Sequence, residues 1–116
     1  MKEGDFKVNF PFNKREQEAT RIIEKYPNRF PIICETAKNN DLNLDKHKYL
    51  IPRDFTFGQF IYILRKRIEI KPEQGVFIFI NNILVPTAGI ISNVYREYKD
   101  DDGFLYMIVS TENTFG

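Results

Sequence analysis

The chain has 116 residues, enough for one domain, and 17 lysines and arginines nearly balance 16 aspartates and glutamates. A net charge of +1 gives no general attraction to polyanions, so no nucleic-acid partner is expected and any electrostatic partner must meet a local patch. The single cysteine excludes an internal disulfide and fits a reducing, cytoplasmic setting, and the longest apolar run, Val76–Ile80, is far too short to cross a bilayer.

The N-terminal quarter predicts helical structure. The first ten residues are expected to form a short helix or arm in which phenylalanines act as packing anchors. Residues Lys14–Tyr26 predict a longer helix, which Pro27 ends. One face of this helix carries apolar residues at the i, i+3, i+4, i+7 spacing: Ala19, Ile22, Ile23 and Tyr26.

Two strands are predicted next. Arg29–Thr36 has apolar residues on both faces, so this strand is either covered on both sides or exposed on one side for a partner. Lys48–Pro52 is shorter, and Pro52 cannot donate to a ladder, which favours an edge strand. An uncovered edge can accept the backbone of another chain.

The segment Thr56–Ile68 predicts the main helix. Thr56 and Gln59 have the spacing of a capping box, which fixes the start of the helix. Its expected buried stripe consists of Phe57, Phe60, Ile61, Leu64 and Ile68.

The C-terminal half alternates short apolar runs with turn residues. The expected elements are a strand at Gln74–Ile80, a turn at Asn81-Asn82, a strand at Ile83–Val85, a helix at Ile90–Tyr98, a charged turn at Lys99–Gly103, a strand at Phe104–Ser110 and a free tail at 111–116. The order of elements predicts an α+β fold, in which one main helix crosses a small mixed sheet and a helical layer is added at the N-terminus.

Motifs for catalysis or cofactor binding are weak in this sequence, so no enzyme activity, cofactor or metal site is expected. Cys34 with His47 is the one conceivable nucleophile–base pair, but a cysteine in a strand more often acts as a small buried hydrophobe. Arg65-Lys66-Arg67 occupies one helical turn and forms no basic stripe for nucleic acid. Asp100-Asp101-Asp102 is more often a solvated turn than a divalent-metal site.

Three stretches resemble one known family. They are KYPNRFPIICE (Lys25–Glu35), DKHKYLIPRDFTFGQFIYILRKRI (Asp45–Ile68) and DDGFLYMIVSTENTFG (Asp101–Gly116). Together they are similar to the GABA-receptor-associated-protein and light-chain-three family of autophagy modifiers. The resemblance implies a ubiquitin-like β-grasp with two additional N-terminal helices. It divides the chain into a helical extension (1–27), a β-grasp core (28–110) and a flexible tail (111–116).

The family resemblance also implies a function. Members are joined through a C-terminal glycine, here Gly116, to phosphatidylethanolamine. Ubiquitin-type activating and conjugating enzymes are the expected partners, with a cysteine protease that processes or releases the modifier. The implied role is autophagosome formation and recruitment of cargo receptors and adaptors that carry aromatic-x-x-aliphatic motifs. The implied location is the cytoplasm, and the autophagosome membrane after lipidation.

The resemblance assigns peptide-binding residues position by position. The aromatic pocket maps onto Glu18, Ile22, Pro31, Lys48, Leu50 and Phe104. The aliphatic pocket maps onto Tyr49, Ile51, Pro52, Phe55, Phe60, Ile63 and Arg67. Contacts to the acidic flank of a peptide map onto Lys25, Arg29 and Lys46, and a second peptide surface onto Phe77, Ile78 and Phe79. Many of the apolar members would be core residues on burial statistics alone.

Two other functional classes stay open. One is a ubiquitin-like binding module that is never conjugated, and the other is a small thiol enzyme that uses Cys34.

Overall fold

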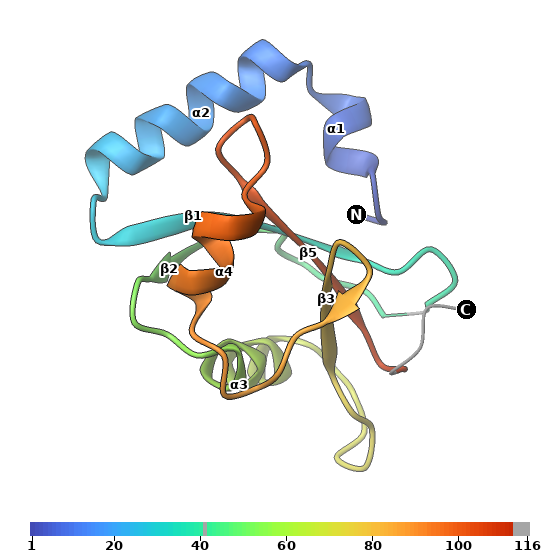
Figure 1. The fold of residues 1–116 in the computed structure, drawn as a ribbon. Helices are drawn as coiled ribbons and strands as arrows, with labels where there is room; N and C mark the ends of the chain where they lie inside the picture. The colour runs from blue at the N-terminus through green and yellow to red at the C-terminus, as the bar shows by residue number, and fades with distance from the viewer. Residues whose placement is uncertain (41, 113–116) are drawn as a thin grey trace.

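The computed structural model describes residues 1–40 and 42–112 (Figure 1). The helices are α1 (Asp5–Asn9), α2 (Phe12–Lys25), α3 (Phe57–Arg67) and α4 (Ile91–Tyr98). The strands are β1 (Arg29–Thr36), β2 (Lys48–Pro52), β3 (Phe77–Ile80), β4 (Ile83–Leu84) and β5 (Leu105–Ser110). The first two strands have the predicted bounds, and a short N-terminal helix is confirmed.

The described strands form one mixed sheet in the order β2-β1-β5-β3-β4. β1 and β5 run parallel to one another, and the other neighbouring strands pair antiparallel. Helix α3 lies on one side of the sheet, and α1 and α2 lie on the other (Figure 1). The predicted α+β fold, with one main helix across the sheet and an added N-terminal layer, is confirmed.

The main core lies between the sheet and α3. Four of the five predicted stripe residues of this helix are buried, whereas Ile61 is only partly buried. The capping box is present: the Thr56 hydroxyl accepts from the Gln59 N–H at 3.2 Å, and the Gln59 side-chain oxygen accepts from the Thr56 N–H at 2.8 Å. The start of α3 is therefore fixed by its own sequence.

Both faces of β1 are covered, which decides between the two alternatives for this strand. Phe30, Ile32 and Cys34 belong to the main core, whereas Ile33 faces the N-terminal layer. Apart from the exposed Arg29 at its start, β1 therefore offers a partner little access to either face, and the exposed strand edge must be sought elsewhere.

Helix α2 contacts the sheet mainly through Ala19, in a cluster with Phe6, Ile33 and Phe104. The predicted apolar stripe is only partly buried, because Ile23 and Tyr26 are 37% and 38% exposed. The contact is concentrated at Ala19 because Gly103 brings the turn before β5 against it. A Cβ on Gly103 would lie 3.0 Å from the Ala19 Cβ, and its φ of +96° also favours glycine. The helix begins at Phe12 rather than Lys14, directly after its N-cap residue Pro11, whose backbone is extended (φ −68°, ψ 157°).

The C-terminal half differs from the prediction at strand ends. β3 begins at Phe77 rather than Gln74 because residues 71–74 form a turn, in which the Gln74 N–H donates to the Lys71 carbonyl at 3.0 Å. β4 is one residue shorter than predicted. The turn between them is confirmed, since Asn81 and Asn82 have φ of 50° and 63°, the conformation of a tight hairpin turn.

The expectation that Asp100-Asp101-Asp102 is a solvated turn is wrong for Asp102, whose side chain is fully buried. The carboxylate accepts from Arg15 Nε at 2.9 Å, from the Phe104 N–H at 2.8 Å and from the Tyr106 hydroxyl. Burial by itself would lower the pKa of Arg15, but the hydrogen bond to Asp102 raises the pKa above its ordinary value. Asp102 is buried because α2 crosses this end of the turn, whereas Lys99 and Asp101 stay exposed. The ion pair ties the N-terminal layer to the sheet.

Candidate functional site

The edge of the sheet at β2 is the starting point of the candidate site. β2 pairs only with β1 among the described strands, with Leu50 opposite Pro31 and Tyr49 opposite Ile32. Tyr49 and Ile51 are buried, whereas Lys48, Leu50 and Pro52 are partly exposed on alternate positions. The predicted edge strand is confirmed, and its outer side is available for a further strand.

A hollow of about 490 Å³ lies between α2 and this edge strand. It is lined by Glu18, Arg21, Ile22, Arg29, Lys46, Lys48 and Leu50. Four of the six residues predicted for the aromatic pocket are therefore brought together here. The other two, Pro31 and Phe104, are buried and do not line the hollow.

The charge of this hollow is mainly positive. Lys48 Nζ forms an ion pair with Glu18 Oε1 at 2.6 Å across the gap between β2 and α2. Arg29 Nη1 donates to the Leu50 carbonyl at 3.1 Å, and Lys46 and Arg21 are exposed. Two of the predicted acidic-flank residues, Arg29 and Lys46, thus border the hollow. Lys25 does not, since its Nζ lies 5.4 Å from the ring centroid of Tyr26.

Sequence reasoning missed Arg21. Its side chain projects from the exposed side of α2, and only the packing of this helix beside β2 brings it to the hollow. The signal available in the sequence was its spacing of three residues after Glu18, which places both on one side of a helix.

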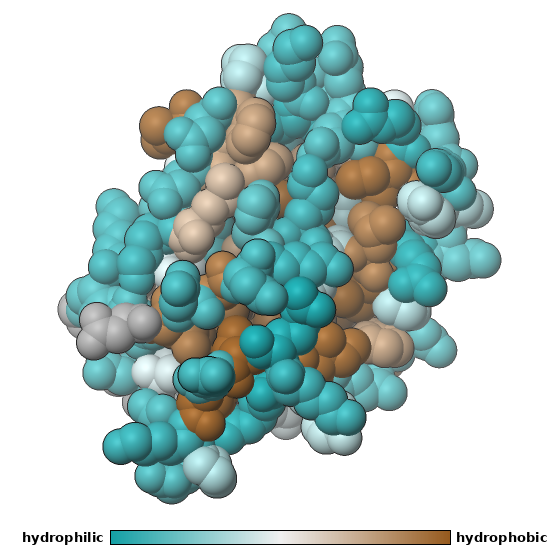
Figure 2. Space-filling view, turned by 180° about the vertical axis from the view of Figure 1, so that it is seen from behind, coloured by the Kyte–Doolittle hydropathy of each residue, from teal (hydrophilic) through white to brown (hydrophobic). Residues whose placement is uncertain are grey.

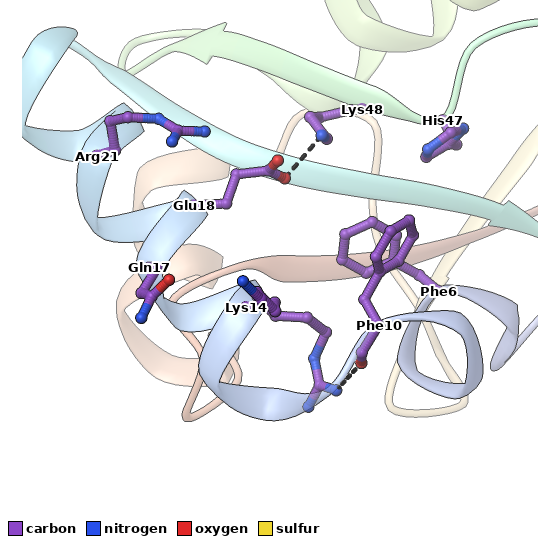
Figure 3. A pocket seen from close by; sticks show the side chains of 9 residues that line it. Phe6, Phe10, Lys14, Gln17, Glu18, Arg21, His47 and Lys48 are labelled. Atoms are coloured by element: carbon purple, nitrogen blue, oxygen red, sulfur yellow. Dashed lines mark hydrogen bonds and ion pairs between the residues drawn. The ribbon is translucent and has the colours of Figure 1, made fainter.

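A second hollow, of about 460 Å³, continues from the first toward α1 (Figure 3). It shares Glu18, Arg21 and Lys48 with the first and adds Phe6, Phe10 and His47, among others. The Phe6 ring lies 4.9 Å from the Phe10 ring and 6.0 Å from the His47 ring, measured between centroids. Burial, followed by the charge of Lys48, lowers the pKa of His47 below its ordinary value.

The residues predicted for the aliphatic pocket divide into two groups. Tyr49, Ile51 and Phe60 belong to the main core, where the Tyr49 and Phe60 rings meet edge to face at 5.3 Å. The remaining four are accessible: Pro52, Phe55 and Ile63 are partly exposed, and Arg67 is exposed and pairs with Asp45 at 3.2 Å. The three core residues can therefore supply only the floor of a pocket here.

The predicted second peptide surface is largely buried. Ile78 belongs to the main core, and Phe79 packs in a small cluster with Ala37 and Ile108. Only Phe77 is partly exposed. Viewed from behind, the molecule presents apolar side chains in strips between hydrophilic ones rather than as one broad patch (Figure 2).

The thiol of Cys34 is in the wrong setting for nucleophilic chemistry. Its side chain is completely buried, and burial raises its pKa well above the ordinary value. His47 meets Cys34 through the backbone, since the Cys34 N–H donates to the His47 carbonyl at 2.7 Å. The interpretation of Cys34 as a buried hydrophobe is confirmed. In the described part of the chain, no group of three acidic, His or Cys side chains is placed to hold a metal.

The three basic residues of α3 have separate surroundings. Arg65 donates to the Gln74 and Pro72 carbonyls, Lys66 lies over the Tyr62 ring, and Arg67 pairs with Asp45. They form no common surface for a phosphate backbone. Gly116, the predicted attachment residue, lies outside the described residues.

Comparison with known proteins identifies the family. A family model described as "Autophagy protein Atg8 ubiquitin like" matches residues 14–116. Autophagy-related protein 8 of Vanderwaltozyma polyspora is 54% identical over 114 residues, covering 97% of both chains, and Autophagy-related protein 8d of Arabidopsis thaliana is 55% identical, covering 97% of this chain and 95% of its own.

Solved structures agree with the fold. The crystal structure of Trypanosoma brucei ATG8 matches with a TM-score of 0.91 and 41% identity, covering 99% of this chain and all of its own. Plasmodium falciparum Atg8, solved in complex with an Atg3 peptide from the same organism, matches with a TM-score of 0.81 and 33% identity, covering 92% and 95%. The mixed sheet with α3 across it is thus the ubiquitin-like β-grasp, and α1 and α2 are its two added N-terminal helices. The chain belongs to the Atg8 family of ubiquitin-like autophagy proteins.

Proposed function

We propose that this Atg8-family protein is a modifier that is joined through Gly116 to phosphatidylethanolamine and recruits proteins carrying aromatic-x-x-aliphatic motifs. It acts without catalysis of its own, in autophagosome formation. Ubiquitin-type activating and conjugating enzymes attach it, and a cysteine protease processes and releases it. It resides in the cytoplasm and, once lipidated, on the autophagosome membrane.

The observation that carries peptide recruitment is the outer edge of β2 beside a preformed hollow. An extended peptide can add a strand to this edge, while its aromatic side chain enters the hollow above Leu50 and Ile22. Four cations and one carboxylate around the hollow favour a peptide with an acidic flank. Each such rim ion pair contributes about 0.2–1 kcal/mol, so the apolar pockets dominate the affinity. The P. falciparum relative was solved in complex with a peptide, which supports peptide binding as a function of this chain.

Lipid attachment accounts for how such a domain stays on a membrane. No helix in the described residues is long and apolar enough to cross a bilayer. Each buried CH₂ of an acyl chain contributes about 0.8 kcal/mol, so two chains give firm anchoring where one is marginal. The family model extends to Gly116, and glycine lets a main chain enter a narrow active-site channel.

Peptide recruitment is tested with a labelled aromatic-x-x-aliphatic peptide that has an acidic flank. Leu50→Ala should weaken its binding roughly tenfold, since about 1–3 kcal/mol of apolar burial is removed. Leu84→Ala is the matched control, because Leu84 is an exposed leucine on β4 at the opposite edge of the sheet. Equal affinity of a folded Leu50→Ala variant and the wild type would exclude the hollow between α2 and β2 as the peptide-binding site.

Attachment is tested by incubating the protein with Atg8 activating and conjugating enzymes, ATP and phosphatidylethanolamine liposomes. Mass spectrometry should find the lipid adduct on the wild type and none on a variant that lacks Gly116. A wild type that forms no thioester and no adduct would contradict conjugation and favour a binding module that is never attached.

A further inference from the structure

A third hollow, of about 440 Å³, lies at the other flank of α2, between the start of β1 and helix α4. Four cationic side chains line it: Arg29, Arg53, Arg96 and Lys99. They come from β1, the loop after β2, helix α4 and the turn that follows α4, so no single stretch of sequence contains the cluster. Arg29 also lines the hollow between α2 and β2, here called the peptide hollow, and the two hollows therefore meet at the start of β1.

The four positive charges are not neutralised by acidic side chains. Arg53 Nε donates to the Pro27 carbonyl at 2.8 Å, and Arg96 Nη2 donates to the Asn93 side-chain oxygen at 2.7 Å. Arg29 donates to the Leu50 carbonyl, and Lys99 Nζ lies 5.8 Å from the Tyr95 ring centroid. Across the described residues, ion pairs form at Lys7, Arg15, Lys48 and Arg67 but at none of these four. Their neutral partners hold the side chains in place and leave the charge available.

The floor of this basic hollow is rigid. The Phe30 and Tyr95 rings stack with centroids 4.2 Å apart and planes 20° apart, and both residues are buried. The Tyr95 hydroxyl donates to the Gly103 carbonyl at 2.6 Å. The Arg53 guanidinium lies over the Phe30 ring, 4.8 Å from its centroid. A cation held over an aromatic face loses little freedom when it binds an anion, which lowers the cost of association.

We propose that this basic hollow binds a phosphate monoester carried on a peptide segment of a partner protein. Three of the four cations are arginines, whose planar forks match pairs of phosphate oxygens, and a dianion is better balanced by several cations than a single carboxylate is. The Ser92 hydroxyl lines the same hollow and supplies a further donor. On the rim, Ile23 is 37% exposed and offers a contact for an apolar residue beside the phosphorylated one.

The choice of a peptide over a lipid headgroup follows from the position of the hollow and rests on the proposed function. β1 runs parallel to β5, with Thr36 opposite Val109, so Arg29 lies at the far end of the sheet from the segment that leads to the tail. Thr36 lies seven strand steps after Arg29, a span of about 23 Å. Attachment of Gly116 to a bilayer directs this end of the molecule toward the cytosol, where a soluble partner meets it.

The test uses a short acetylated peptide in which phosphoserine is flanked by leucines, titrated into isotope-labelled protein and followed by NMR. The backbone signals of Ser92, Tyr95 and Arg96 should shift progressively. The double variant Arg53→Gln/Arg96→Gln should weaken binding at least tenfold, and because both side chains are exposed it should stay folded. The matched control Lys66→Gln/Lys71→Gln removes two exposed charges elsewhere and should change binding less than twofold.

Comparison probes identify the source of the phosphate. The unphosphorylated peptide, a glutamate analogue and inorganic phosphate should each bind at least fivefold more weakly than the phosphopeptide. Inorganic phosphate that binds as tightly, or equal binding by the double variant, would overturn the proposal. Vesicles containing a phosphoinositide that occupy the hollow while the phosphopeptide does not would also overturn it and assign a lipid headgroup.

The test of the basic hollow is independent of peptide binding in the hollow between α2 and β2. Leu50→Ala should leave phosphopeptide binding unchanged, and Arg53→Gln/Arg96→Gln should leave the binding of an aromatic-x-x-aliphatic peptide unchanged. A negative result for phosphopeptide binding therefore leaves the proposed binding of aromatic-x-x-aliphatic peptides untouched. A negative result for those peptides is likewise detected in its own titration.

Discussion

Removal of the buried carboxylate at Asp102 should destabilise the protein more than any surface charge substitution. Asp102→Ala leaves the guanidinium of Arg15, whose side chain is only 9% exposed, without its anion. It also leaves the Phe104 N–H and the Tyr106 hydroxyl without their acceptor. Breaking a buried ion pair by deleting one partner costs about 3–5 kcal/mol. Because domains of this size are stable by about 5–15 kcal/mol, roughly a fifth or more of the stability should be lost.

The measurement is urea unfolding of the wild type, of Asp102→Ala and Arg15→Met, and of three comparison variants. Asp101→Ala changes the exposed neighbour and should cost less than about 0.5 kcal/mol. Asp45→Ala breaks the exposed pair with Arg67, in which both side chains are at least 40% accessible, and should cost about 0.2–1 kcal/mol. The double variant Arg15→Met/Asp102→Ala should be more stable than the sum of its single variants predicts, by at least about 1 kcal/mol. A loss for Asp102→Ala equal to that for Asp101→Ala, or strict additivity, would refute the reasoning.

Two other groups have measurable consequences. His47 is the only histidine, so its ring signal is unambiguous in NMR, and it should titrate below pH 6.5 because burial and Lys48 lower its pKa. Protonation then favours the unfolded chain, so this residue's contribution to stability is complete above about pH 6.5 and declines as the pH falls toward the folded pKa; a folded pKa at or above 6.5 would contradict this. Cys34 is buried with a raised pKa, so its alkylation by iodoacetamide at pH 8 should be at least roughly 100-fold slower than in denaturant, and comparable rates would revive the thiol-enzyme alternative.

Elements specified by local chemistry were predictable from the sequence. The capping box of Thr56 and Gln59 fixes the start of α3 through contacts three residues apart, and the two asparagines at 81–82 adopt the positive φ of a tight turn. Pro52 at the end of β2 indicated an edge strand because proline cannot donate to a ladder. In each case the physical cause lies within a few residues of its effect.

Features that depend on distant contacts were not predictable in this way. In the sequence, Asp102 is one of three consecutive aspartates of the kind found in solvated turns. It is buried only because α2 crosses the turn and places Arg15, 87 residues earlier in the chain, against it. Likewise, Ile23 belongs to an apolar stripe at ideal helical spacing but stays exposed, because the contact of α2 with the sheet is concentrated at Ala19. Periodicity indicates which residues share a face, whereas the partner surface decides how much of that face is buried.

The parallel pairing of β1 with β5 separates the proposed attachment site from the proposed recognition sites. Parallel neighbours place their starting ends together, so the start of β1, where the peptide hollow and the basic hollow meet at Arg29, lies opposite the end of β5 that leads to the tail. An antiparallel pair would have brought the tail to the same end as both hollows. A modifier with this topology can therefore be held at one end while partners bind at the other. Helix α2 lines both hollows from opposite sides, so under the proposed function the N-terminal layer takes part in recognition as well as covering the sheet.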